Sequence, residues 1–410
     1  MRASKQWVLG SGRKRVLVDL RGLEPDGVNG GLQTYVTWLL PWLLDKHREK
    51  FEIVALARFS NLDLAVSLLG EDDAVVVEAD SNRALRNGRG RCPTIAVCSM
   101  RAVQLIHQLG IEVLYSPLGS LPCVPPMGVC SISLVADMLH LEMPMCLEYP
   151  IIRDRTRSLE MLEKHASWVQ CISHSSETRL LHHIPRLKGR TFFSYLPIHT
   201  RFSNDARLKA PASTKPFFFY PANFWAHKNH LALIIGYNQY LKQTEGEPWD
   251  LVLTGADYKG GMEKALALTY SLGIKDRVIF KGYVSDKEMS ELWNSAGALV
   301  FPSLHEGFGI PILEAMHHKV PILTSPSYSL MEIAGPAALY FNPMKPIQIA
   351  GRMLEVAGSK TLRHRLSEKG EERLKKFSDC DEAELVVSAL AGEVPVRPSS
   401  GVHPQCGCPI

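Results

Sequence analysis

The sequence has no apolar run close to the roughly 18 residues that a membrane-spanning helix requires. The longest apolar stretches, residues 38–44 and 298–301, are short and contain or adjoin proline and polar residues. The first ten residues, MRASKQWVLG, have no apolar core long enough for a secretory signal. The pattern therefore predicts a cytoplasmic protein that does not cross a membrane.

Cysteine pairs with the spacing of a redox or metal motif are also missing. The nine cysteines are odd in number, and none forms a C-x-x-C pair. This usage is typical of reduced thiols in a cytoplasmic protein, not of a disulfide framework. No cluster of cysteine and histidine has the spacing of metal ligands, so the sequence predicts no metal site.

A strong excess of either charge is absent. Residues 1–205 hold 24 Lys and Arg against 21 Asp and Glu, and the remainder holds 22 against 21, which sum to a net charge of +4. Neither part is basic enough to indicate nucleic acid as the main partner, and none is expected. One local excess, 9 basic against 4 acidic residues over 153–201, has two readings. It is either a solvated helical surface or a weak docking face for an anionic membrane or a phosphorylated lipid.

What is present is an alternation of strands and helices. Short β-branched runs alternate with amphipathic segments, which predicts an α/β fold with parallel sheets and right-handed crossovers. The clearest expected strands are residues 14–20, 51–57, 112–117, 130–137, 217–222, 250–255, 277–284, 297–303 and 320–325, and residues 168–173 are expected to enter a strand at the end of the preceding helix. The clearest expected helices are residues 32–45, 103–110, 151–170, 229–241, 262–273, 286–296 and 311–318.

The alternation divides the chain into two Rossmann-like domains, because a polar, proline-containing stretch at 201–216 interrupts it. The expected parts are an N-terminal domain over 1–205, a linker over 206–216, a second domain over 217–376, a helix over 377–393 that packs back on the first domain, and a disordered tail over 394–410. Two such domains facing each other create a ligand cleft at the C-terminal ends of their strands.

The most distinctive string is HEGFGIPILE at residues 305–314. A buried strand precedes it, and its proline suits the first position of a helix. Gly307 and Gly309 let a ligand approach the backbone, whose N–H groups at a helix start bind phosphate or a polar sugar. Glu306 and Glu314, with seven residues between them, can reach different hydroxyl pairs of one long ligand.

On this string the chain resembles glycosyltransferase family 4, retaining enzymes of the GT-B fold. The family's E-x7-E signature matches Glu306 and Glu314, and the resemblance covers roughly residues 14–390. It implies that Glu314 binds the ribose hydroxyls of a nucleotide-sugar. It also implies that Glu306 holds the donor sugar together with the backbone of Gly307, Phe308 and Gly309.

Other donor-side segments match the same family. Gly30 and Gly31 resemble its N-terminal glycine loop, and a glycine pair before a helix leaves N–H donors for a diphosphate. The stretch YPANFWAHKNH at 220–230 resembles a mannosyltransferase-like branch, in which Lys228 matches the lysine that neutralises the departing diphosphate.

Two further donor contacts are implied by position. Many members have arginine where this chain has Asn223, and His227 is the substitute donor that we expect beside it. Tyr283 lies in KGYV, which resembles the stretch whose main chain meets the nucleobase. Lys319 stands where the family usually has glycine, and a left-handed lysine would cost about 1 kcal/mol.

On the acceptor side, LVADMLHLEMP at 134–144 resembles the family's strand-end motif. Asp137 and His140 match it, whereas Ala136 replaces the usual histidine. An aspartate and a histidine at the cleft could orient an acceptor or donor hydroxyl, or take up a proton. The replacement at Ala136 leaves the identity of the proton acceptor open.

The resemblance implies a metal-independent, retaining transfer of a hexose from a nucleotide-sugar to a glycan or lipid-linked glycan. GDP-mannose is the favoured donor, and no cofactor beyond this substrate is expected. Two alternatives stay open: a non-catalytic protein of the same fold that binds nucleotide or glycan, and a nucleotide-sugar epimerase. A dehydrogenase is disfavoured, because no G-x-G-x-x-G follows the first strand.

Overall fold

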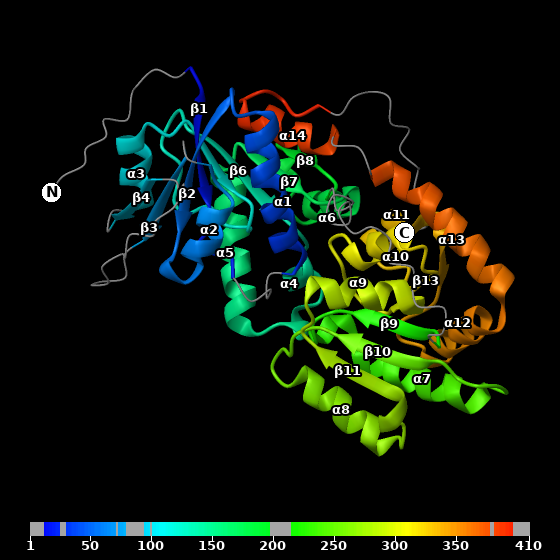
Figure 1. Ribbon diagram of the computed structural model, residues 1–410. Helices are drawn as coiled ribbons and strands as arrows, with labels where there is room; N and C mark the ends of the chain where they lie inside the picture. The colour runs from blue at the N-terminus through cyan, green and yellow to red at the C-terminus, as the bar shows by residue number, and fades with distance from the viewer. Residues whose placement is uncertain are drawn as a thin grey trace.

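The structure, a computed structural model, describes residues 12–24, 30–70, 73–78, 94–98, 101–196, 215–377 and 381–396. The core of the expected linker, the end of the expected tail and most of the first glycine-rich loop lie outside these residues. Two parallel β-sheets, one in each half of the chain, form the framework (Figure 1). The α/β class with two facing domains is thereby confirmed.

The first sheet has eight strands in the order β4-β3-β2-β1-β5-β6-β7-β8. Their bounds are β1 (Lys14–Asp19), β2 (Phe51–Ala57), β3 (Ala74–Glu78), β4 (Thr94–Cys98), β5 (Val113–Ser116), β6 (Cys130–Val135), β7 (Trp168–Cys171) and β8 (Thr191–Phe193). The pairings are parallel throughout. All seven residues of β2 are buried, including Glu52, whose carboxylate pairs with Arg15.

The second sheet has six strands in the order β11-β10-β9-β12-β13-β14. Their bounds are β9 (Phe217–Pro221), β10 (Asp250–Thr254), β11 (Val278–Gly282), β12 (Ala296–Phe301), β13 (Ile322–Thr324) and β14 (Ala338–Tyr340). The strand order reverses between β9 and β12, and in the first sheet between β1 and β5. Ligands of doubly wound sheets bind outside the carboxyl ends of strands at such reversal points.

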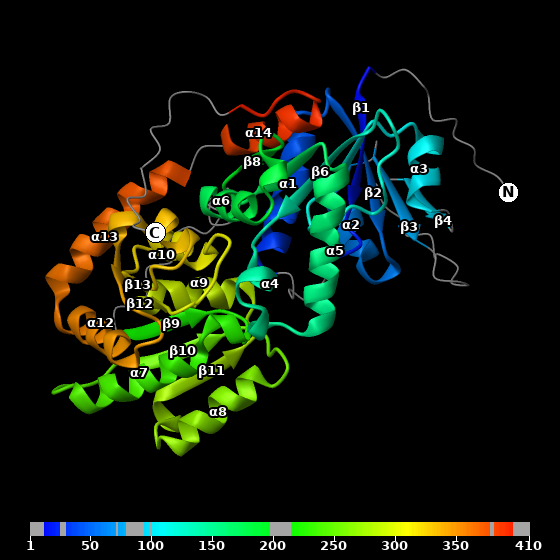
Figure 2. The same cartoon turned by 180° about the vertical axis from the view of Figure 1, so that it is seen from behind.

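Helices cover both faces of each sheet (Figures 1 and 2). Those of the first domain are α1 (Gly31–Lys46), α2 (Leu62–Ser67), α3 (Ala102–Leu109), α4 (Leu139–Glu142), α5 (Tyr149–His165) and α6 (His174–His183). Those that follow are α7 (His230–Gln243), α8 (Gly261–Ser271), α9 (Asp286–Ser295), α10 (Ile310–His317), α11 (Ser329–Ala334), α12 (Pro346–Gly358), α13 (Lys360–Leu374) and α14 (Asp381–Leu390).

Local capping explains several helix starts. The Ser173 and Ser359 side chains accept hydrogen bonds from the first turns of α6 and α13. Ser285 and Glu288 form a capping box at the start of α9. These side chains satisfy backbone N–H groups that a helix start otherwise leaves without an acceptor.

The final helix returns to the first domain. Both views place α14 beside α1 and β8 (Figures 1 and 2). Its Glu382 carbonyl accepts a hydrogen bond of 2.7 Å from Ser194 Oγ, and Glu384 Oε1 lies 3.0 Å from His47 Nε2. In the described ranges, no helix is both long and apolar enough to span a bilayer.

An aromatic cluster joins the two domains near this return. Tyr195 follows β8 and lies 6.1 Å from Phe308 and 5.2 Å from Phe377, measured between ring centroids. Phe308 and Phe377 lie 6.4 Å apart in an edge-to-face arrangement. Both phenylalanines are buried, so the hydrophobic core continues from one domain into the other.

Candidate active site

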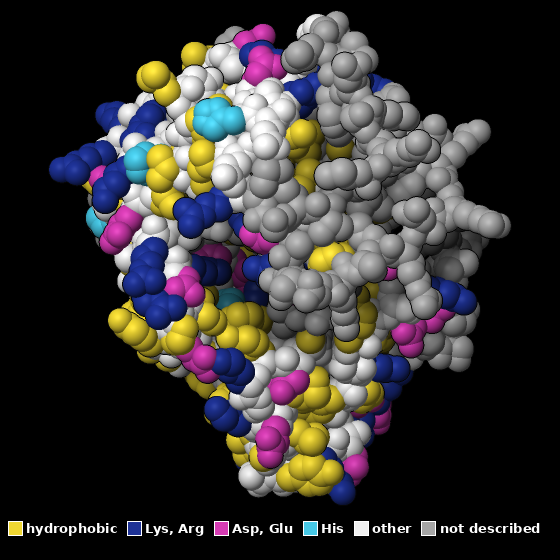
Figure 3. Space-filling model, turned by 90° about the vertical axis from the view of Figure 1, so that its left-hand side faces the viewer, with side chains coloured by type: hydrophobic (Ala, Val, Ile, Leu, Met, Phe, Trp, Pro, Cys, Tyr) yellow, Lys and Arg dark blue, Asp and Glu magenta, His cyan; other side chains and the backbone are white. Residues whose placement is uncertain are grey.

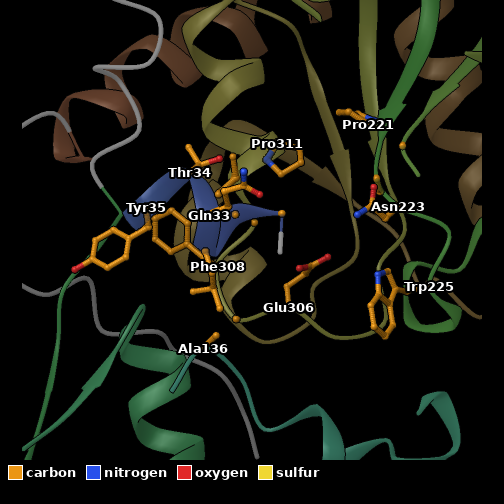
Figure 4. A pocket seen from close by; sticks show the side chains of 18 of the residues that line it. Gln33, Thr34, Tyr35, Ala136, Pro221, Asn223, Trp225, Glu306, Phe308 and Pro311 are labelled. Carbon is orange, nitrogen blue, oxygen red and sulfur yellow. The ribbon is translucent and has the colours of Figure 1, made fainter. Parts of the chain in front are cut away.

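A cavity of about 960 Å³ lies between the domains at the carboxyl ends of the strands. Its walls come from the start of α1, the end of β6, the first part of α5, the loop after β9 and the loop between β12 and α10. Figure 3 shows a hollow on one side of the molecule that contains acidic, basic and histidine side chains. Figure 4 shows Glu306 directed into the space between α1 and the β9 loop.

Glu306 and Lys228 form the charged centre of this cavity. Lys228 Nζ lies 2.5 Å from Glu306 Oε1, although 78 residues separate them in the sequence. Ser303 Oγ donates a second hydrogen bond of 2.6 Å to the same carboxylate oxygen. The Lys228 and Glu306 side chains are 19% and 11% exposed. The pair is therefore largely shielded from water, where its attraction is stronger than at a surface.

The loop from Glu306 to Gly309 is fixed by buried hydroxyls. Ser329 Oγ donates to the carbonyls of Glu306 and Phe308, and Ser173 Oγ donates to the Gly307 carbonyl at 2.7 Å. Gly309, with φ of +102°, precedes the first turn of α10. A side chain at that backbone angle would be strained. The loop thus presents a rigid helix N-terminus to the cavity.

Glu314 lies one turn inside α10 and also lines the cavity. Glu314 is buried, with 4% of its surface exposed. Gly30 and Gly31 face it from the other domain at the start of α1, and Gly30 has φ of +53°. Tyr283, which follows β11, is 69% exposed at another part of the wall. The structure therefore brings together the separate segments expected to hold a donor.

The loop after β9 carries the remaining donor-side residues. The Asn223 side-chain oxygen Oδ1 accepts a 2.8 Å hydrogen bond from the Ala256 backbone amide, so this side chain fixes the loop as well as lining the cavity. Burial and the charge of Lys228 lower the pKa of His227 to about 2. His227 is consequently a neutral hydrogen-bonding group at neutral pH, not a cation.

The first domain supplies Asp137 at the end of β6. Its Oδ1 accepts hydrogen bonds of 2.9 Å from the Leu139 amide and 2.7 Å from Arg155 Nη1. Burial by itself would raise the pKa of Asp137, but Arg155, His305 and the backbone hydrogen bond outweigh it and lower the pKa to about 2. Asp137 therefore stays ionised at neutral pH.

His140 is placed differently from the other expected residues. It is 3% exposed in α4 and does not belong to the cavity lining. Burial and the nearby Arg155 lower its pKa to about 4, so the ring is neutral. Its position gives it no direct contact with the cavity, because α4 turns it into the protein interior.

Three groups around the cavity have no counterpart in the sequence expectations. Arg155 lies on α5 and Trp225 in the β9 loop, and both line the cavity. Glu142 Oε2 lies 2.9 Å from His305 Nε2, and Glu142 also pairs with Arg179 and with His183. His305 precedes Glu306, so this pairing anchors the donor loop to the first domain. Only the fold brings these residues together, and no short motif joins them.

Some basic side chains of the region at 153–201 pair within the fold, whereas Arg153, Arg157 and Arg186 are exposed. Arg153 pairs with Asp154, and Arg186 with Glu163. Arg190 donates to the carbonyls of Ala166 and Glu163. The exposed basic side chains are compatible with both interpretations, so membrane docking stays a prediction. Within the described ranges no three or more His, Cys, Asp or Glu side chains gather as metal ligands would.

Comparison with known proteins agrees with this arrangement. Residues 203–373 match the family model of glycosyl transferases group 1. The O-antigen chain mannosyltransferase B of Escherichia coli is 33% identical over 152 residues, which are 37% of this chain and 39% of that protein. The O-antigen chain mannosyltransferase RfbU of Salmonella typhimurium is 34% identical over 121 residues, 29% of this chain and 32% of that protein. The matched segments thus span about a third of these relatives.

Similarity in structure extends over both domains. The crystal structure of HepE from Anabaena in complex with UDP superposes with a TM-score of 0.63 at 14% identity, covering 92% of this chain and 100% of that chain. The likeness in fold, together with the two facing parallel sheets, confirms the predicted GT-B architecture.

Proposed function

We propose that this protein, whose residues 203–373 match the family model of glycosyl transferases group 1, transfers a hexose from a nucleotide-diphosphate sugar to a glycan acceptor. The observation that carries the proposal is the Lys228–Glu306 pair, which lies in the interdomain cavity beside a helix N-terminus. The non-catalytic and epimerase alternatives gain no support from the site or the comparisons.

The donor would lie along the second domain. Glu314 would bind the ribose hydroxyls, and the backbone near Tyr283 would meet the nucleobase. Two groups would stabilise the diphosphate: the backbone N–H groups at the start of α1, at Gly30 and Gly31, and the ammonium of Lys228. Both favour negative charge. Glu306 and the Gly307–Gly309 backbone would hold the sugar, with Asn223 and His227 beside it.

The chemical step we propose proceeds with retention and without a metal ion. The bond between the sugar C1 and the leaving phosphate oxygen breaks, and a bond from C1 to the acceptor oxygen forms on the same face. The acceptor's hydroxyl proton goes to the departing phosphate. Lys228 and the helix N-termini stabilise the charge that develops there, which is the type of preorganised assistance that accelerates such steps. Asp137, with its pKa of about 2, is a weak base and is better suited to orienting a hydroxyl.

Mannose from GDP-mannose is the donor we favour. The support is the YPANFWAHKNH stretch and the two O-antigen chain mannosyltransferases among the relatives. The acceptor would be a glycan or a lipid-linked glycan. We place the reaction in the cytoplasm, with peripheral contact at the inner face of a membrane where a lipid-linked acceptor is presented.

The first test is a calorimetric panel of GDP, UDP, ADP and their hexose conjugates without added metal. We expect one nucleotide to bind selectively and Glu314→Ala to weaken it by at least about tenfold, the loss of about 1.4 kcal/mol of hydrogen bonding. Lys228→Ala should mainly lower turnover in a sugar-transfer assay, because this lysine acts on the charge that develops on the leaving diphosphate. Equal binding of the nucleotide by the wild type and the Glu314 variant would contradict the assignment.

A further inference from the structure

We propose that the Asp137–Arg155 pair and Trp225 form an acceptor subsite that selects a neutral sugar over a phosphorylated one. The proposal deepens the proposed function and rests on it for the identity of the reaction. All three residues line the cavity, the first two from the N-terminal domain and Trp225 from the C-terminal domain. The site therefore exists only between the domains.

Trp225 offers an aromatic wall of fixed orientation. Its ring stacks on Tyr258 with centroids 3.5 Å apart and planes inclined by 14°. Lys259, next to Tyr258 in the loop between β10 and α8, forms an ion pair with Glu148 at the start of α5. This ion pair connects the loop that supports Trp225 to the first domain. Figure 4 shows Trp225 at the edge of the cavity, across from Ala136 and beside Glu306. The face of an aromatic ring is electron-rich and attracts the polarised C–H groups on the flat side of a pyranose.

The opposite wall is charged but locally balanced. Arg155 Nη1 donates 2.7 Å to Asp137 Oδ1, and their side chains are 42% and 21% exposed. Asp137 also accepts the Leu139 amide, so the backbone N–H beside it is directed at a carboxylate. A phosphate placed here would face the Asp137 charge instead of an N–H group. The balanced pair disfavours a second anion and suits neutral hydroxyls.

A sugar satisfies both members of this pair. One hydroxyl can donate to Asp137 while a neighbouring hydroxyl accepts from Arg155, and the ring's C–H face meets Trp225. Leu147 and Ile151 supply apolar contacts along the same wall. His227, whose ring centroid lies 6.1 Å from that of Trp225, connects this subsite to Lys228. The acceptor hydroxyl would thus be delivered beside the proposed donor phosphate.

The test titrates the full chain with α-linked mannotriose and with the same trisaccharide carrying one terminal phosphate, in the presence of saturating GDP. We expect the wild type to prefer the neutral sugar. Trp225→Ala and Arg155→Gln should each weaken mannotriose by about tenfold or more. Trp225→Phe should recover most of the loss, and Tyr270→Ala, which alters an exposed ring on α8, should change nothing.

A substitution that changes the charge of the pair tests the preference between the two sugars most directly. Asp137→Asn leaves the Arg155 charge without its balancing carboxylate, so the preference should move by at least about tenfold toward the phosphorylated sugar. A wild type that prefers the phosphorylated sugar, or a Trp225→Ala variant that binds mannotriose normally, overturns the subsite.

The nucleotide titration tests the proposed function and the sugar titration tests the subsite, so either hypothesis can be contradicted without the other. A wild type that binds GDP and neither sugar overturns the subsite and leaves the proposed donor site standing. If the wild type binds mannotriose but binds none of the nucleotides tested, the proposed function fails and the subsite survives. In that case the sugar titrations are repeated without GDP and decide the same comparison.

Discussion

Lys319 illustrates how a single residue departs from the local preference of its position. It follows α10 with φ of +58°, a left-handed angle that glycine adopts without cost. Its amide donates to the Met316 carbonyl, which is a helix-ending contact that this angle permits. The lysine side chain pairs with Glu371 at 2.6 Å, both about half exposed, and such pairs contribute little.

We therefore expect Lys319→Gly to be more stable than Lys319→Ala by about 1 kcal/mol. Both substitutions remove the ion pair with Glu371, so their difference isolates the backbone angle. Urea unfolding of the two variants measures it. Equal midpoints with equal slopes would show that the left-handed angle imposes no strain.

At the residue scale, sequence reasoning reached the groups carried by short strings. Glu306, Glu314 and Lys228 each lie in a motif and line the cavity, and their roles remain predictions. The sequence did not predict Arg155 and Trp225 as site residues, because the residues that form the cavity with them come from other segments of the chain. His140 stood in a motif, yet the turn of α4 buries it away from the cavity.

At the scale of elements, the start of α6 forms a bond between domains. Glu332 on α11 accepts hydrogen bonds from the His174 and Ser175 amides at 2.9 and 2.7 Å. This buried carboxylate occupies the positive end of a helix, and it does so from the opposite domain. The contact joins α6 to the segment that supports the donor loop through Ser329.

Glu332→Gln should destabilise the protein by about 1–2 kcal/mol, because the amide keeps the shape and removes the charge. Hydrogen exchange should accelerate at the amides of His174 and Ser175. Glu368→Gln on α13 alters an exposed carboxylate and serves as the matched control. Unchanged exchange at α6 would mean that the charge of Glu332 adds nothing to the contact.

Elements with a strong pattern were predicted closely. The expected strand at 51–57 is β2, and the helix expected at 286–296 is α9, Asp286–Ser295. The strands β3, β4, β8 and β14 were missed. β8 and β14 have three residues each, which is too short to show a period. The helix expected over 151–170 was too long: α5 ends at His165, and β7 begins at Trp168.

The last of these errors has a tertiary cause. Ser167 lies in the tight turn between α5 and β7, where its amide donates to Ser131 Oγ and its hydroxyl accepts from the Ser131 amide, both at 3.0 Å. Residue 131 lies on β6, so the turn depends on a distant strand. The strand expected at 168–173 agrees with β7, but the end of the helix at His165 depends on this contact with β6.

At the scale of the whole molecule, buried histidines make stability depend on pH. Burial, with help from Arg155 at His140 and Lys228 at His230, lowers the pKa of these rings to about 4 and about 3. The unfolded chain has a histidine pKa near 6.5 and binds protons first as pH falls. Each ring therefore stabilises the fold above about pH 6.5, and this contribution is lost as pH falls toward the folded pKa.

The free energy of unfolding should fall by about 1.4 kcal/mol per histidine for each pH unit below about 6.5. Asp137 and Glu142, whose pKa values are lowered to about 2 in the fold, add a further loss from about pH 4 downward. Urea unfolding between pH 7 and 5 measures the first part. His140→Phe should flatten the slope by one histidine's share.

His364, an exposed residue on α13, supplies the control for this experiment. His364→Gln replaces a ring that is 77% exposed and is the matched control for the loss of one histidine. If His140→Phe keeps the full slope, the buried ring is not the source of the pH dependence.

Two glycines at the cavity have a meaning beyond ligand approach. A methyl group at Gly307 would lie 2.0 Å from the Ala136 carbonyl oxygen, and one at Gly31 would lie 2.4 Å from Ile310 Cδ1. Both clashes fall between the domains, and at Gly307 the obstacle is backbone, which cannot rotate aside. A single added methyl would force the two domains apart, and the cleft between them would widen most at the points farthest from the clash. The absence of side chains at Gly31 and Gly307 thus limits the width of the cleft, because it allows the two domains to approach each other this closely.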